Sequence, residues 1–286
     1  METPVITASH LKPIGRLSRA DEHGVLPRIG RAPEEPLFSE LSQFAEKLKL
    51  ELGEHFHCLA VRGSASRGTF VKGASDIDLI VFAYGPALQT LSPEHCITQA
   101  TDIDLEWFEP EDFLQSSRYQ WLKFSLSYSG YCFGPQNLLT ELPAPTLGSR
   151  AIAHLHRVDR WAKAWPTHLA DAKTDGERKR ACSWLMKRIV RSLFEAEMLK
   201  RNVYSRDIYP CAEIASEAFP SHAPMIWRAA ELAVAPTSEL SLIREVADCL
   251  LPELLNLQSR LRRDMEHVHS ETPQLPLLFT TQSRFT

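Results

Sequence analysis

The spacing of apolar residues divides this chain of 286 residues into two parts with different periods. Apolar residues recur at helical intervals over 37–52, and beyond about residue 149 helical patterns continue to about residue 267. Between these regions, short apolar or alternating runs are typical of strands. The predicted strands are 57–61, 76–82 and 101–108. The pattern therefore predicts an α/β (α+β) fold with a sheet-containing N-terminal domain and an all-helical C-terminal domain.

Proline residues mark the limits of these domains. Five prolines lie within the first 36 residues, which show no sustained period, so we expect an irregular arm there rather than a packed element. Pro143 and Pro145 fall where the strand pattern ends, as linkers often do. The predicted organisation is an arm at 1–36, an α/β domain at 37–145, a helical domain at 146–270 and a tail at 271–286.

Composition and charge narrow the class of protein. Hydrophobic residues make up 44% of the chain and charged residues 24%, the balance of a globular protein. A net charge of −4 gives no general footprint for nucleic acid, so we do not expect that partner. The six cysteines form no Cys-x-x-Cys pair and no zinc-ligand spacing, which fits a reduced, cytoplasmic chain. We expect neither a signal peptide nor a membrane span, because no long apolar run occurs.

Acidic residues mark two of the predicted strands. Side chains alternate across a strand, so Asp76 and Asp78 point the same way, roughly 6–7 Å apart along it. Asp102, Asp104 and Glu106 share one face of the next strand for the same reason. If the two strands are neighbours, their carboxylates converge on the oxygen-rich setting that two Mg²⁺ ions need for phosphoryl-type displacement.

These carboxylates also have a simpler interpretation as solvated faces of edge strands, which we favour for Asp102. For Asp76 and Asp78 we favour a metal site. They begin an apolar strand whose sequence predicts burial, and buried carboxylates need a cation or a metal.

The turn before the second strand contains a second group of candidates. Gly63 allows close approach of phosphate to the backbone, and the Ser64 hydroxyl suits a β- or γ-phosphate oxygen. Ser64 would equally serve as the N-cap of a short helix. Arg67 has two equal interpretations, as a phosphate ligand or as a brace against an acidic neighbour.

A third group lies on the clearest amphipathic helix, predicted over 177–201. Its polar side carries Arg180, Trp184, Lys187, Arg188 and Arg191. A basic stripe interleaved with tryptophan suits a triphosphate and a base. A solvated basic face is the alternative of equal weight.

A polar loop and four histidines are two further features of the sequence. The loop 202–211 is dense in polar and aromatic side chains, and we slightly favour an Arg206–Asp207 loop brace over a functional loop. The histidines at 154, 156, 267 and 269 form i, i+2 pairs that a helix does not bring to one face. We therefore expect them on the surface.

Together the turn and the aspartates resemble the signature of the polymerase-β-type nucleotidyltransferase superfamily. The residues that carry the resemblance are Gly63-Ser64, Arg67-Gly68-Thr69, Ser75-Asp76-Ile77-Asp78-Leu79 and Asp104. The resemblance implies a mixed sheet, metal ligation by Asp76, Asp78 and Asp104, and a nucleotide site that includes Ser64 and Ser75. Glu106 is the candidate general base, or the third ligand in place of Asp104. In layout the helical half is similar to that of bacterial aminoglycoside adenylyltransferases.

The resulting hypothesis is a Mg²⁺-dependent nucleotidyltransferase. It moves a nucleoside monophosphate, AMP from ATP, onto a hydroxyl of a small-molecule acceptor and releases pyrophosphate. The turn residues Gly63, Ser64, Arg67 and Ser75, with Lys187, Arg188 and Arg191, are expected to hold the nucleotide. Two alternatives stay open: a toxin-like enzyme that modifies a protein or tRNA, and a nucleotide-binding regulatory protein without turnover.

Overall fold

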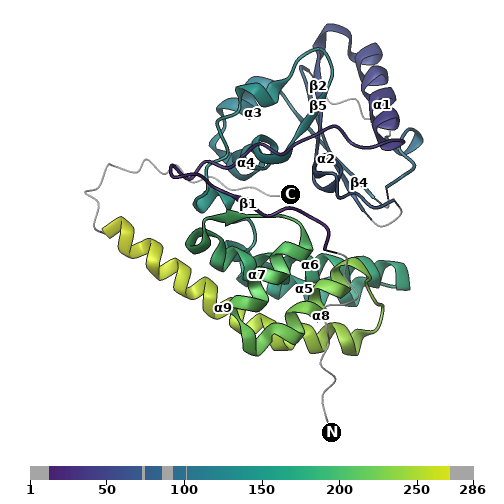
Figure 1. The fold of residues 1–286 in the computed structure, drawn as a ribbon. Coiled ribbons are helices and arrows are strands. Elements are labelled where there is room, and N and C mark those ends of the chain that lie inside the picture. Colours follow the sequence, from purple (N-terminus) through teal and green to yellow (C-terminus); the bar gives the residue numbers. More distant parts are fainter. Residues whose placement is uncertain (1–12, 73–74, 86–92, 101, 271–286) are drawn as a thin grey trace.

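The computed structural model describes residues 13–72, 75–85, 93–100 and 102–270, which form a sheet-containing part and a helical part (Figure 1). This arrangement confirms the predicted α/β fold class with a helical C-terminal half. The predicted tail at 271–286 and the first twelve residues of the predicted arm lie outside the described residues. Within the described residues, no helix combines the length and apolar character needed to cross a membrane.

A four-stranded sheet in the order β4-β3-β2-β5 forms the centre of the first part. Its strands are β2 (Phe56–Arg62), β3 (Ile77–Ala83), β4 (Ile103–Phe108) and β5 (Tyr131–Phe133). β3 runs parallel to β4, whereas the β2–β3 and β2–β5 pairs are antiparallel. The sheet is therefore mixed, and each of the three predicted strands is found within about two residues of its expected start.

Helices cover both faces of this sheet, which explains why β3 is apolar at nearly every position. The covering helices are α1 (Leu37–Leu52) on one face, and α3 (Pro110–Gln115) and α4 (Gln120–Ser129) on the other. Leu79 and Val81 pack toward α1, whereas Ile80 and Phe82 pack toward α3 and α4. Alternation along β3 places Asp78 on the α3–α4 face.

The second part is a bundle around one long helix. Its helices are α5 (Val158–Asp171), α6 (Asp175–Arg201), α7 (Ile208–Ala218), α8 (Ala223–Val234) and α9 (Leu240–Ser270). α6 contacts the other four and buries Leu185, Ile189 and Leu193 among them. It begins at a capping box in which Thr174 and Glu177 satisfy each other's backbone N–H groups. The helix predicted over 177–201 is confirmed, two residues longer at its start.

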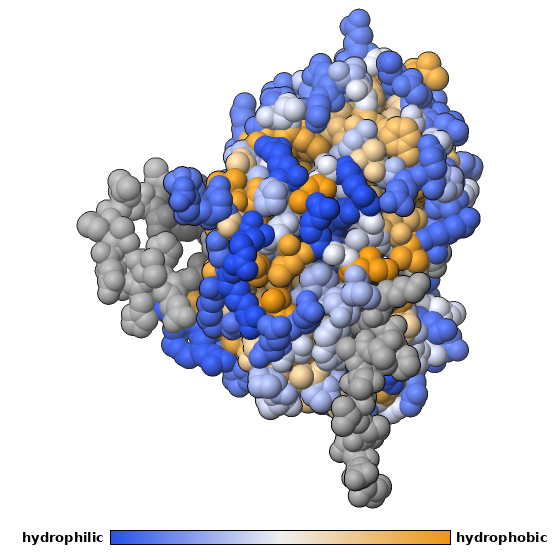
Figure 2. All heavy atoms as spheres, viewed as in Figure 1, coloured by the Kyte–Doolittle hydropathy of each residue, from blue (hydrophilic) through white to orange (hydrophobic). Residues whose placement is uncertain are grey.

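The N-terminal segment is packed, and the expectation of an unpacked arm is wrong for its described residues. β1 (Ser18–Arg19) pairs with β6 (Val203–Tyr204) of the helical part. Farther along, the backbone N–H of Arg31 donates to the carbonyl of Ser66 in the sheet part. In Figure 1 this purple segment runs between the two parts, and Figure 2 shows hydrophilic side chains interleaved with hydrophobic ones across the middle of the molecule. Backbone hydrogen bonds hold it, and apolar periodicity does not indicate those.

Candidate active site

Three strands bring charged residues side by side at one end of the sheet. Asp78 on β3 pairs in register with Asp104 on β4 and with Arg62 on β2. Residues in register on neighbouring strands project from the same face, so these three side chains lie next to one another. Asp76 precedes β3 by one residue. The condition for convergence of the carboxylates, that the two acidic strands are neighbours, is therefore met.

Arg62 is a member of this cluster that the sequence analysis missed. Its guanidinium lies 2.9 Å from Asp78 Oδ1 and 3.9 Å from Glu106 Oε1, and it stands 5.5 Å from the Trp121 ring centre. Burial raises the pKa of the Asp78 carboxyl, the charge of Arg62 opposes that rise, and Asp76 and Asp104 add to it. The sequence feature that could have identified Arg62 is a charged residue at the end of a largely apolar strand, just before Gly63.

The acidic side chains differ in exposure from what the sequence suggested. Asp76 and Asp104 are exposed, whereas Asp78 and Glu106 are half-buried. The inference that burial of Asp76 requires a metal is therefore wrong, because its carboxylate reaches solvent. Burial raises the pKa of Glu106, with smaller contributions from the charges of Asp104 and Asp78. In the described part of the chain, no three His, Cys, Asp or Glu side chains gather closely enough to hold a metal by themselves.

The Gly63 turn lies directly against this cluster. Gly63 has φ +84°, and a Cβ added to it would lie 2.8 Å from Asp78 Oδ2. Helix α2 (Ser64–Arg67) follows, with Gly63 itself as N-cap. The Ser64 hydroxyl is buried and has no hydrogen-bond partner among the described residues, so the N-cap interpretation of Ser64 is wrong. Ser75 is engaged elsewhere, since its hydroxyl accepts from the Val71 N–H.

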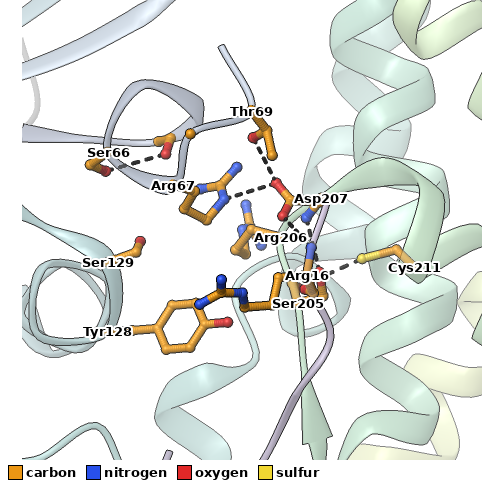
Figure 3. Close-up of polar contacts among 12 residues, drawn as sticks. Arg16, Ser66, Arg67, Thr69, Tyr128, Ser129, Ser205, Arg206, Asp207 and Cys211 are labelled. Atoms are coloured by element: carbon orange, nitrogen blue, oxygen red, sulfur yellow. Dashed lines mark hydrogen bonds and ion pairs between the residues drawn. The ribbon is translucent and has the colours of Figure 1, made fainter. Parts of the chain in front are cut away.

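Arg67 acts as a brace in this structure. Its Nε donates to Asp207 Oδ1 at 2.9 Å, and both side chains are buried. Figure 3 shows Asp207 at the centre of this group, where it also accepts from the Thr69 hydroxyl and the Arg16 N–H. The predicted pairing of Asp207 with Arg206 is wrong. Asp207 links the helical part to the turn instead of bracing its own loop.

The basic stripe of α6 divides into two groups. Lys187 faces the acidic cluster, with Nζ 3.8 Å from Asp76 Oδ2. The charge of Arg191 opposes the rise in the pKa of Asp78 that burial causes. Burial and nearby arginines lower the pKa of Arg191 itself to about 9, so it stays charged at pH 7. Arg188 lies elsewhere, 4.3 Å above the Trp184 ring. Arg180 is exposed.

Arg206 and His154 belong with Arg188. Arg206 is 3.4 Å from Glu195 and 2.9 Å from His154 Nε2, while Arg188 is 3.4 Å from His154 Nδ1. His154 is thus half-buried between two guanidinium groups, and the expectation of a surface histidine is wrong for it. The side chains of the histidines at 267 and 269 lie outside the described residues.

Comparison with known proteins finds structural likeness to nine solved chains. No protein-family model matches the chain, and no curated protein sequence matches it. Its fold is similar to the crystal structure of spectinomycin adenyltransferase AAD(9) from Enterococcus faecialis with ATP and spectinomycin. The alignment covers 78% of this chain and 99% of that one, with 11% sequence identity and a TM-score of 0.49. A likeness of this extent bears on neither the substrates nor the site residues of this chain.

Proposed function

We propose that this chain is a nucleotidyltransferase that moves AMP from ATP onto a hydroxyl of a small-molecule acceptor and releases pyrophosphate. One observation carries the proposal. Asp78 and Asp104 pair in register on two parallel strands, and Asp78 lies so close to the Gly63 turn that a Cβ at Gly63 would not fit. Phosphoryl-type transfer needs this combination of acidic residues and a close backbone approach.

The donor set suits Mg²⁺, which prefers oxygen ligands. Asp76, Asp78 and Asp104 would hold the metal together with oxygens of the bound triphosphate, because the three side chains do not gather closely enough to hold it by themselves. Burial raises the pKa of Asp78, and the charges of Asp76 and Asp104 raise it further, which indicates like-charge repulsion that a cation relieves. When bound, the metal would neutralise negative charge on the phosphates. Arg62 pairs with one carboxylate oxygen of Asp78, so the other oxygen of Asp78 would stay available for the metal.

The residues around the turn would bind and orient the triphosphate. The unpartnered Ser64 hydroxyl is buried beside the cluster and is free to donate to a phosphate oxygen. Lys187 and Arg191 come from α6 on the opposite side and supply positive charge near Asp76 and Asp78. Catalysis would rest on positioning and charge stabilisation, as in other transfers of phosphoryl groups.

Glu106 would take the proton from the acceptor hydroxyl. Its carboxylate is half-buried, lies on the same strand as Asp104 and has a raised pKa, which makes it a better base than an ordinary glutamate. The charge of Arg62, 3.9 Å away, opposes this rise in the pKa of Glu106.

The test is pyrophosphate release from ATP and Mg²⁺ with a panel of hydroxylated small molecules. Asp78→Asn and Asp104→Asn should each lower kcat by about a hundred-fold or more, the scale for loss of one group that stabilises transition-state charge. Asp112→Asn is the control, because Asp112 is an exposed aspartate in the same part of the molecule. Wild-type and Asp78→Asn rates that agree would contradict the proposal.

Two further readouts separate the alternatives. Calorimetry that shows ATP binding without pyrophosphate release by the wild type would favour a regulatory protein. Intact masses of cellular proteins and tRNA after expression would reveal a toxin-like enzyme as an added nucleotide mass on either.

A further inference from the structure

A cationic group separate from the acidic cluster lies between α6, the loop before α7 and α4. Its members are Trp121, His154, Trp184, Arg188 and Arg206, which we call the arginine–tryptophan group. Contacts run through it without a break. Arg206 lies 5.5 Å from the Trp121 ring centre and 2.9 Å from His154, and His154 lies 3.4 Å from Arg188.

This group is connected to the acidic cluster through Trp121. Arg62 stands 5.5 Å from the same ring that Arg206 approaches, and Arg62 also pairs with Asp78. The tryptophan thus lies between one arginine of the acidic cluster and one of the arginine–tryptophan group. A molecule bound along this line would extend from the reacting phosphate toward Trp184.

Positive charge in the group exceeds the negative charge available to balance it. Among the described residues, Glu195 is the one carboxylate within ion-pair distance of Arg188 or Arg206. Its two oxygens already accept backbone N–H groups of residues 153–155. Arg188 has no acidic partner in that set. Burial lowers the pKa of His154, and the charges of Arg206, Arg191 and Arg188 lower it further.

Donors in the group are also left without acceptors. Arg188 Nε and Trp121 Nε1 are buried and have no hydrogen-bond partner among the described residues. Both nitrogens of His154 face guanidinium groups, although a neutral imidazole offers one acceptor. Buried donors without partners cost free energy, and an anion at this place would satisfy them.

We propose that the arginine–tryptophan group binds a phosphate or carboxylate group of the acceptor, so that the acceptor is an anionic hydroxyl compound. This inference rests on the proposed function. Lys187 and Arg191 remain for the triphosphate, because Lys187 faces Asp76 whereas Arg188 faces His154. Amine-rich, polycationic acceptors are disfavoured by the same excess of positive charge.

The first test measures anion binding without turnover, by calorimetry of the full chain with inorganic phosphate and, separately, acetate. Both titrations are repeated with a non-hydrolysable ATP analogue and Mg²⁺ present. Arg188→Gln should weaken binding about ten-fold, and Arg180→Gln, an exposed arginine on the same helix, should leave it unchanged. Anion binding should persist when the ATP analogue is bound.

Equal anion affinity in wild type and Arg188→Gln, or complete displacement of the anion by the analogue, would overturn the proposal. Thermal unfolding of each variant checks that it is folded.

The second test compares acceptors by pyrophosphate release: glycerol 3-phosphate, glycerol, glycerate and glucosamine. We expect turnover of glycerol 3-phosphate or glycerate at lower KM than glycerol. Arg188→Gln should raise KM for the anionic compound and leave kcat nearly unchanged. Preference for glucosamine would overturn the proposal. Absence of release with every acceptor would count against the proposed function, whereas the phosphate titration still decides whether the anion site exists.

Discussion

Asp207 accepts a hydrogen bond from Arg67 Nε at 2.9 Å, and this buried pair joins the Gly63 turn to the start of α7. Asp207 is the N-cap residue of α7, yet its side chain makes no hydrogen bond to that helix. Aspartate normally accepts from the first turn in this position. Its carboxylate is used instead to hold Arg67, Thr69 and the Arg16 backbone. The pair thereby fixes the turn relative to the helical part.

Asp207→Ala should lower the free energy of unfolding by about 3–5 kcal/mol, because it leaves the Arg67 guanidinium buried without its partner. Urea unfolding followed by circular dichroism measures the change. Glu217→Ala is the matched control. It removes an ion pair with Arg201 of similar length, 2.7 Å, but the pair is more exposed, so the expected loss is less than about 1 kcal/mol. Equal losses in the two variants would show that Asp207 is not an anchor.

Much of the acidic cluster follows from the sequence because it depends on local rules. Side-chain alternation places Asp76 and Asp78 on one face of their strand, and Asp104 and Glu106 on one face of the next. The apolar character of these strands leaves few ways in which the strands can pair. The partners of Arg67 and Asp207 could not be predicted in the same way. They lie 140 residues apart, and only the packing of the helical part against the turn brings them together.

Arg62 was not identified from the sequence, and His154 was wrongly expected on the surface, for a related reason. Each looks ordinary in its own segment: a last strand residue, and one of several scattered histidines. Their environments arise from other segments, Asp78 and Trp121 for Arg62, and Arg188 and Arg206 for His154. Which charged groups surround a residue depends on the assembled fold, so these environments could not be predicted from the local sequence.

The pH dependence of turnover should report Glu106. A general base must be ionised, so kcat/KM should fall as pH decreases through the pKa of Glu106, which burial raises above its ordinary value of 4.5. Arg62 opposes this rise, and Arg62→Gln should therefore move the acidic limb to higher pH in its residual activity. Glu106→Gln should remove the limb. An unchanged profile in Glu106→Gln would assign the base elsewhere.

Stability should depend on pH through His154. Burial and the neighbouring arginines hold the pKa of His154 well below its ordinary value of 6.5, so below that pH the unfolded chain binds a proton that the folded chain does not. The stabilising contribution is complete above about pH 6.5 and is lost as pH falls. The loss grows as the pH falls further below 6.5, by at most about 1.36 kcal/mol per pH unit for one proton.

The contribution of His154 to this pH dependence is measured by comparing the unfolding of wild type and His154→Gln between pH 7 and 5. His154→Gln should lose less stability over this range. His23→Gln, at an exposed histidine, should follow the wild-type curve. Parallel curves for all three proteins would mean that another group controls the acid sensitivity.

Gly63 offers the sharpest test of the contact between turn and cluster. Gly63 and Gly53 both have positive φ, +84° and +58°, with ψ of −150° and −129°, so alanine at either position costs about 1–3 kcal/mol in backbone strain. Only at Gly63 would the new Cβ approach Asp78 Oδ2, at 2.8 Å, whereas nothing lies within 4 Å at Gly53. Gly63→Ala should therefore displace the Asp78 carboxylate and lower kcat about a hundred-fold, since misplacement of about 1 Å has effects of that size. Gly53→Ala should lose similar stability and keep its activity. If both variants keep wild-type turnover, the turn and Asp78 do not act together in one site.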